Sequence, residues 1–192
     1  MRVKIKTKKM TIIALSVALA MIFSYVESLI PPLSMVPGVK IGLANTVSVF
    51  LLYSLGPAEA ALVSLIRVCL SSMLFGTPIS FVYSVAGAVV SLIAMVIAKR
   101  FLPFSKVGVS VIGALMHNAG QVAAACVVMG TAAIAVYFIP LIITGTVSGV
   151  LIGVIAGIVI SRIAKFLNPK KTGGKTFVKE EKKKADTVSK KK

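Results

Sequence analysis

Residues 79–98 read ISFVYSVAGAVVSLIAMVIA, and this run of 20 residues contains no charged side chain. At about 1.5 Å of rise per residue, a helix of this length crosses the roughly 30 Å hydrocarbon core of a bilayer. The run is continuous rather than alternating, which is typical of a membrane-spanning helix and not of a barrel strand. Residues 79–98 therefore predict an integral membrane protein.

Similar apolar runs occur along most of the chain, and 57% of its 192 residues are hydrophobic. Proline and glycine turns such as Pro31-Pro32 and Gly56-Pro57 separate the runs. We predict one all-α domain over residues 10–166, with no room for a second folded domain and a short cap or re-entrant piece before Pro140. Its six membrane-spanning helices are predicted at about residues 10–30, 40–55, 57–75, 79–98, 107–130 and 138–166.

Basic residues gather at both ends of the chain, which has a net charge of +17. Five of them precede residue 10, and twelve lie between Arg162 and Lys192. Because cytoplasmic segments are rich in Lys and Arg, and six spans place both ends on one side, we predict cytoplasmic termini. Residues 1–9 are then a basic N-terminus and residues 167–192 a lysine-rich disordered tail that can contact anionic lipids. We expect no nucleic-acid binding, since no aromatic residues are interleaved with the basic ones.

We single out seven polar or charged side chains in the hydrophobic stretch from Met10 to Phe166. Burying such groups in lipid costs several kcal/mol each when they are unpaired, so membrane proteins usually retain them for function. Helical spacing predicts that the last three share one face of a helix. The predicted substrate-binding residues are Glu27, Lys40, Asn45, Arg67, His117, Asn118 and Gln121.

Helix geometry places this polar set in the middle and the outer half of the predicted bundle. Arg67 and His117 each lie about 15 Å from the cytoplasmic end of their helix, whereas Glu27 and Asn45 lie nearer the outer face. Within this set Lys40, Arg67 and a protonated His117 would outnumber the single acid, Glu27. This balance predicts an anionic ligand such as a carboxylate or a phosphate, with Arg67 as a bidentate clamp.

Each polar residue also has a purely structural interpretation. Glu27 could pair with Arg67 or Lys40, Lys40 could extend to the interface, and Asn45 could bond neighbouring helices. A lone buried His is often a hydrogen-bonded structural residue. A bundle held by polar contacts alone is therefore an alternative to a ligand site.

Small residues recur at intervals of four on two predicted helices. Such spacing lets helix backbones approach closely, either inside the protein or against a partner, and we favour internal packing for the glycines. Ala14 and Ala18 are a weaker pattern of the same kind. The predicted packing glycines are Gly145, Gly149, Gly153 and Gly157.

The sequence gives little support to catalysis or to a metal centre. It contains no HExxH, no nucleotide-binding glycine loop and no Ser-His-Asp set, so we expect a protein that is not an enzyme and has no cofactor. With one His and no Asp before Asp186, a metal site is not expected. Cys69 and Cys126 lie in apolar runs and are predicted to be packing residues.

Residues 36–45 read VPGVKIGLAN, and they are followed by Arg67, by LFG at residues 74–76 and by HNAGQ at residues 117–121. With these motifs the chain resembles the Gx transporter family, also catalogued as heptaprenyl diphosphate synthase component I. That family is similar to the substrate-binding S components of energy-coupling factor (ECF) transporters. The resemblance covers about residues 11–166.

The resemblance implies a six-helix S-component fold in the bacterial cytoplasmic membrane, with an outward-facing pocket capped by the loop between the first two helices. It also implies partners, a coupling membrane protein and two ATPase subunits, and the AxxxA motif at Ala14 and Ala18 matches the docking motif. We expect the substrate to be a small, anionic organic molecule such as a vitamin, flavin, isoprenoid or quinone precursor. The alternative is an accessory membrane subunit of polyprenyl diphosphate synthesis or of a redox system. Catalysis itself is not expected, because prenyl synthases need paired aspartates and this chain has no Asp before Asp186.

Overall fold

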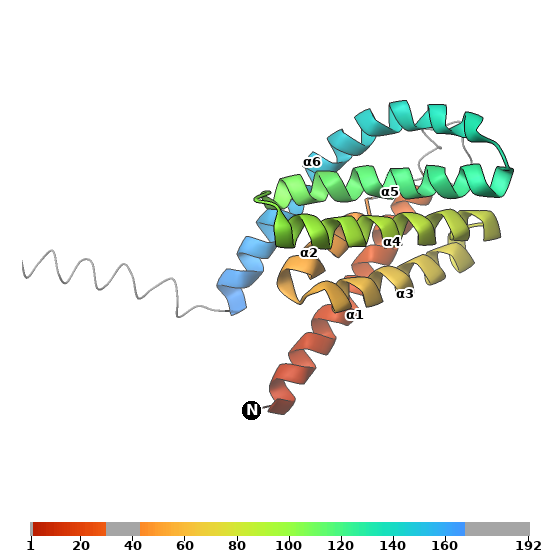
Figure 1. Ribbon diagram of the computed structural model, residues 1–192. Helices are drawn as coiled ribbons and strands as arrows, with labels where there is room; N and C mark the ends of the chain where they lie inside the picture. The colour runs from red at the N-terminus through yellow and green to blue at the C-terminus, as the bar shows by residue number, and fades with distance from the viewer. Residues whose placement is uncertain (1, 30–42, 168–192) are drawn as a thin grey trace, which may run out of the picture. The chain divides into compact units, whose positions relative to one another are not determined.

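The computed structural model describes the backbone of residues 2–29 and 43–167, and within these ranges all side chains except those of residues 2–6, 8 and 163–167. The described chain is helical, as predicted, and contains no strand (Figure 1). The elements are α1 (Arg2–Leu29), α2 (Asn45–Ser54), α3 (Pro57–Phe75), α4 (Pro78–Phe101), α5 (Lys106–Met129), the 3-10 helix η1 (Ala132–Tyr137) and α6 (Phe138–Leu167).

Five stretches of the described chain are long and apolar enough to cross a membrane. They carry exposed large hydrophobic side chains, such as Leu15, Leu65 and Val147, which suit contact with lipid. These stretches make the chain a multi-pass membrane protein. They are Lys9–Leu29, Pro57–Phe75, Pro78–Phe101, Lys106–Met129 and Ala132–Arg162.

The predicted second span differs in the structure. Leu43 and Ala44 form a turn and α2 begins only at Asn45, so α2 has 10 residues. Ten residues extend about 15 Å, half of the hydrocarbon core. Because α2 is buried among other helices, it does not need the length of a lipid-facing span. The sixth span is therefore not confirmed, and the position of both termini on one side remains a prediction.

The chain divides into two compact units after Gly157. The first contains α1 to α5, η1 and α6 as far as Gly157. The described part of the second is the last part of α6, residues 158–167. The loop predicted between the first two helices, which begins with Pro31 and Pro32, and the lysine-rich tail from residue 168 onward lie outside the described residues.

The three helices α4, α5 and α6 pack closely because of their glycines. A Cβ atom on Gly120 of α5 would lie 2.9 Å from the carbonyl oxygen of Ala86 in α4. On the other side of α5, a Cβ atom on Gly149 of α6 would lie 2.7 Å from the Cα atom of Val111. Helix backbones can therefore touch on two sides of α5, and this contact holds α5 in place.

The four glycines of α6 do not all serve this contact. Cβ atoms on Gly145 and Gly153 would also come within 2.7 Å of α5, whereas one on Gly157 would have no atom within 4 Å. Three of the four thus lie against α5 inside the first unit, and Gly157 lies in open space.

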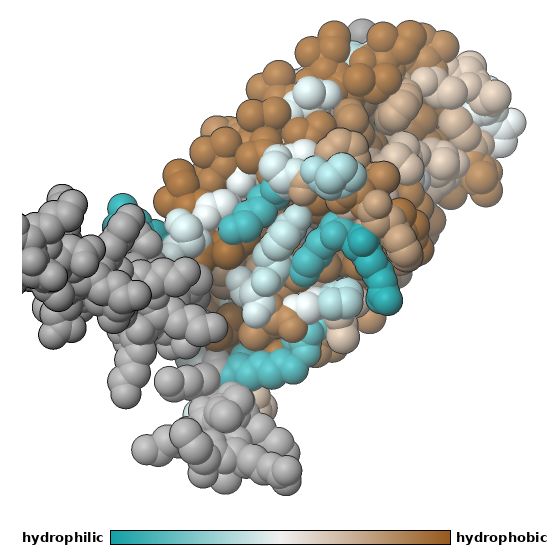
Figure 2. Space-filling model, turned by 60° about the vertical axis from the view of Figure 1, so that its left-hand side comes forward, coloured by the Kyte–Doolittle hydropathy of each residue, from teal (hydrophilic) through white to brown (hydrophobic). Residues whose placement is uncertain are grey.

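Charged residues mark one end of the bundle, here called the basic end and defined by Lys9, Lys99 and Arg100. Lys9 of α1 forms an ion pair with Glu59 of α3. Lys99 of α4 donates a hydrogen bond of 2.6 Å to the carbonyl oxygen of Leu52 in α2. Figure 2 shows hydrophilic residues gathered at one end, with hydrophobic surface beyond them. The opposite end, where α1 and α3 finish, is here called the far end.

Candidate functional site

Six of the seven predicted substrate-binding residues lie in the described part of the chain, and all six are buried. Their exposed fractions run from 0% to 7%, so none of them faces the surrounding lipid. Lys40 lies outside the described residues. The buried residues are Glu27, Asn45, Arg67, His117, Asn118 and Gln121.

The helix pair α2–α3 positions Arg67. The two helices are joined by a turn at Leu55 and Gly56, and Gly56 has a φ of 130°, which side-chain-bearing residues rarely adopt. The hydroxyl oxygens of Ser48 and Ser64 lie 2.8 Å apart and set the register of the antiparallel pair. Asn45 precedes Ser48 by three residues and Arg67 follows Ser64 by three, so the first turn of α2 lies at the level of Arg67.

Arg67 interacts electrostatically with Glu27 of α1. The structure thus brings together two residues that the sequence could only suggest as partners. Within the described residues, the Nε atom of Arg67 has no hydrogen-bond partner. The guanidinium is therefore buried with a neutralising charge nearby but with donor capacity left over.

The N-terminus of α2 adds to the positive potential at this level. Its N-cap residue, Ala44, is fully buried and offers no side-chain oxygen to the first amide groups of the helix. The N-terminal end of a helix carries a partial positive charge. An anionic group placed beside Arg67 would meet both charges.

Asn45 connects three helices. Its Nδ2 atom donates a hydrogen bond of 3.2 Å to the hydroxyl of Ser91 in α4, and this hydroxyl donates one of 2.7 Å to the carbonyl oxygen of Gly113 in α5. The amide nitrogen of Asn45 therefore serves as an interhelical link. This matches the structural interpretation of Asn45 as a residue that bonds neighbouring helices.

The three polar residues of α5 do not share one neighbour, although their spacing predicted one common face. His117 and Gln121 lie against Gly87 of α4, where a Cβ atom would be 3.0 Å from His117 Cε1 and 2.8 Å from Gln121 Cγ. Asn118 instead donates a hydrogen bond of 3.0 Å to the carbonyl oxygen of Leu141 in α6. One residue turns the helix by about 100°, and this rotation is enough to give Asn118 a different partner helix.

Several polar atoms around α5 have no hydrogen-bond partner in the part of the chain that the structure describes. They include both amide atoms of Gln121, the Oδ1 atom of Asn118 and the hydroxyl of Tyr83. Tyr83 is fully buried in α4 and packs with Val122 and Ala125 of α5. Tyr83 was not predicted as a site residue from the sequence, because a tyrosine in an apolar run is typical of packing. Its position four residues before Gly87, on the same face of α4, was the signal that could have found it.

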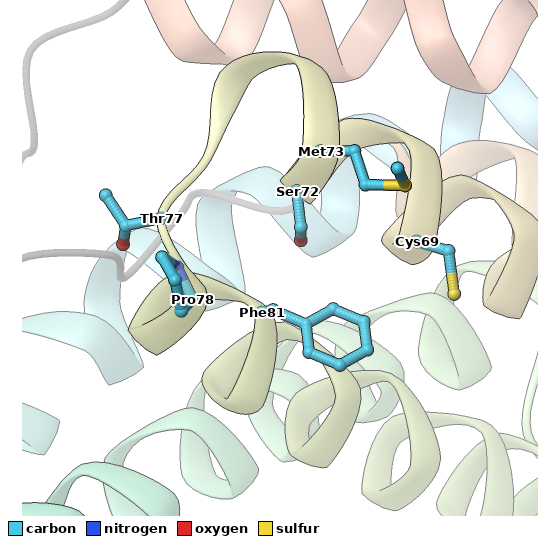
Figure 3. A pocket seen from close by; sticks show the side chains of 6 residues that line it. All are labelled: Cys69, Ser72, Met73, Thr77, Pro78 and Phe81. Atoms are coloured by element: carbon cyan, nitrogen blue, oxygen red, sulfur yellow. The ribbon is translucent and has the colours of Figure 1, made fainter.

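A separate apolar groove of about 360 Å³ lies between α3 and α4 near the far end (Figure 3). Cys69 is two residues from Arg67 and thus about 200° away around the helix, so the groove opens on another side of α3. No described residue of the predicted polar set lines it. Its lining residues are Cys69, Ser72, Met73, Thr77, Pro78 and Phe81.

The remaining predicted residues lie away from the polar set. Ala14 and Ala18 are exposed on α1. Cys69 and Cys126 are free thiols of intermediate burial. Over the described residues, no three His, Cys, Asp or Glu side chains are grouped in a way that could hold a metal ion.

These features define a helical, multi-pass membrane protein with polar side chains buried between its helices. The chain belongs to the family described as heptaprenyl diphosphate synthase component I, whose model matches residues 16–159. No curated protein and no solved structure matches the chain.

Proposed function

We propose that this protein is the substrate-binding membrane component of an ECF-type transporter and that it captures a small anionic organic molecule. The observation that carries the proposal is the buried guanidinium of Arg67, which keeps an unpartnered Nε atom within the described residues. Buried arginines are costly in a membrane and usually have a functional partner.

Charge favours an anionic ligand. Arg67 and the N-terminus of α2 are positive, and Glu27 is the acid that interacts with Arg67. A carboxylate or phosphate would accept hydrogen bonds from the guanidinium in a bidentate arrangement. His117 and Gln121, which lie together against Gly87, would contact the rest of the molecule.

The direction of transport follows from the distribution of charge. The basic end faces the cytoplasm by the positive-inside rule, so the far end faces outward. Ligand would enter from the far end, and a change of conformation would release it inward. The protein itself catalyses no reaction. A coupling membrane protein and two ATPase subunits supply the energy, and the exposed Ala14 and Ala18 of α1 offer a small-residue face to the coupling protein.

Replacing Arg67 tests this function. Small molecules retained by the gently purified protein can be identified by mass spectrometry, and their affinity measured for the wild type and for Arg67→Ala. We expect at least a hundredfold loss of affinity, because the charged hydrogen bonds disappear. Arg162→Ala removes an exposed arginine and is the matched control. Unchanged affinity in Arg67→Ala, with normal membrane insertion, would refute the assignment.

A second candidate function comes from the family's description as a synthase component. The chain has no Asp before Asp186 and so lacks the paired aspartates that hold diphosphate through magnesium. It would then be an accessory membrane subunit of polyprenyl diphosphate synthesis, or of a membrane redox system. Copurification separates the candidates, since ATPase and coupling subunits indicate transport, and a soluble prenyl synthase or a flavoprotein indicates the accessory role.

A further inference from the structure

Gln121 is the most deeply buried polar residue of the candidate site. Its exposed fraction is 0%, and within the described residues neither its Oε1 nor its Nε2 atom has a hydrogen-bond partner. An amide presents one acceptor and two donors, and burying them unpaired is strongly unfavourable. Gly87 allows this burial, because its missing Cβ atom would lie only 2.8 Å from Gln121 Cγ.

Tyr83 provides a second unpartnered group on the same interface. Its side chain is 0% exposed, and its hydroxyl has no partner among the described residues. Tyr83 lies one turn before Gly87 on α4 and packs with Val122 and Ala125, the α5 residues just beyond Gln121. Tyr83 and Gln121 therefore both belong to the α4–α5 interface, about one helical turn apart along α4.

We propose that Gln121 and Tyr83 form a neutral subsite for a planar group that presents a hydrogen-bond donor and acceptor side by side, such as an amide, imide or lactam. This inference rests on the proposed function and specifies its substrate class. The ligand carries an anionic group at Arg67 and an amide-type group at Gln121. An amide edge satisfies both amide atoms of Gln121 at once, which a purely apolar isoprenoid chain cannot do.

The competing explanation is that the two side chains bond each other or their neighbours as structural links. The unliganded protein distinguishes these cases. Gln121→Met and Tyr83→Phe keep the side-chain volume roughly constant and remove the polar atoms. If the groups are unpartnered without ligand, the unfolding temperature of each variant stays equal to that of the wild type or rises.

The stability experiment uses the full chain in detergent, washed until native mass spectrometry detects no bound small molecule. Ser91→Ala is the control, because its hydroxyl has two interhelical hydrogen bonds and its loss should lower the unfolding temperature. A decrease in Gln121→Met and Tyr83→Phe as large as that of Ser91→Ala would show structural pairing and overturn the inference.

The binding experiment uses the molecule that the wild type itself retains after gentle purification. We expect it to contain both an acidic and an amide-type group, and its affinity to fall about 10- to 100-fold in Gln121→Met and Tyr83→Phe. A retained molecule without an amide-type group overturns the inference. The inference is also overturned if Gln121→Met and Tyr83→Phe both bind with wild-type affinity and Arg67→Ala loses binding. In those two cases the proposed function stands. If Arg67→Ala also keeps wild-type affinity, or if the wild type retains no molecule, both proposals fail.

Discussion

Buried side chains such as Asn45 and Gln121 look alike in the sequence but have different surroundings in the fold. Asn45 donates a hydrogen bond to Ser91, and Asn118 donates one to the backbone of α6. Gln121 and Tyr83 have unpartnered atoms within the described chain. The hydrogen bonds of Asn45 and Asn118 support the structural interpretation of polar residues, and the unpartnered atoms of Gln121 and Tyr83 are the basis of the proposed ligand subsite.

Ser91→Ala should destabilise the protein without changing ligand affinity. The substitution leaves the amide nitrogen of Asn45 and the carbonyl oxygen of Gly113 buried and unpaired, at a cost of about 1–3 kcal/mol. Chemical unfolding in detergent measures the effect. Ser161→Ala, which removes an exposed hydroxyl bonded only within α6, is the matched control and should have almost no effect. Equal stabilities of the two variants would show that the Asn45–Ser91 link is dispensable.

Helix α5 is the element on which the proposed site depends. Glycine contacts bring α4 and α6 against it on two sides, and it carries His117, Asn118 and Gln121. Helix α2 also contributes to the proposed site, because it has only 10 residues and its N-terminus therefore lies inside the bundle at the level of Arg67. A change that separates α5 from α6 should therefore disturb both stability and binding.

Gly149→Ala and Gly157→Ala test this packing. The new methyl group at position 149 would lie 2.7 Å from the backbone of Val111, which should cost about 1–3 kcal/mol of unfolding free energy. At position 157 there is open space, and alanine should stabilise the helix by about 0.5–1 kcal/mol. Thermal unfolding of the two variants gives the comparison. A stabilising effect at position 149 would contradict close contact between α5 and α6.

On the face of the molecule that Figure 2 shows, hydrophilic residues gather at one end and hydrophobic surface lies beyond them. This asymmetry is the basis for the proposed orientation in the membrane. The charge asymmetry does not depend on the number of spans. Over the described residues there are five long spans, because α2 is too short to count as a sixth.

Cysteine labelling tests the orientation. The background variant has Cys69 and Cys126 replaced by Ser. Single cysteines are then introduced by Thr131→Cys, at an exposed position between α5 and η1 at the far end, and by Ser54→Cys, at an exposed position at the end of α2 near the basic end. A membrane-impermeant maleimide added to intact cells should label position 131 and not position 54. Labelling of position 54 alone would reverse the proposed direction of transport.

Apart from α1, which begins at Arg2 rather than at residue 10, the long helices could be predicted from the sequence to within a few residues, because hydropathy and proline or glycine turns act locally. The predicted limits of residues 57–75 coincide with α3, and those of residues 79–98 fall inside α4. Helix α2 was predicted less well, since a helix surrounded by protein need not have the length of the bilayer. The buried position of Arg67, His117 and Gln121 followed from their apolar context, but their partners did not.

The amino-acid sequence alone determined that this chain is a helical membrane protein with costly polar groups inside it. Those properties depend on hydropathy and charge summed over neighbouring residues. Only the tertiary structure decided that Glu27 interacts electrostatically with Arg67, that Asn118 bonds to α6 and that Tyr83 packs with Val122 and Ala125 of α5. These pairings depend on how far each helix is rotated against helices that are distant in the sequence, and helix rotation is set by packing.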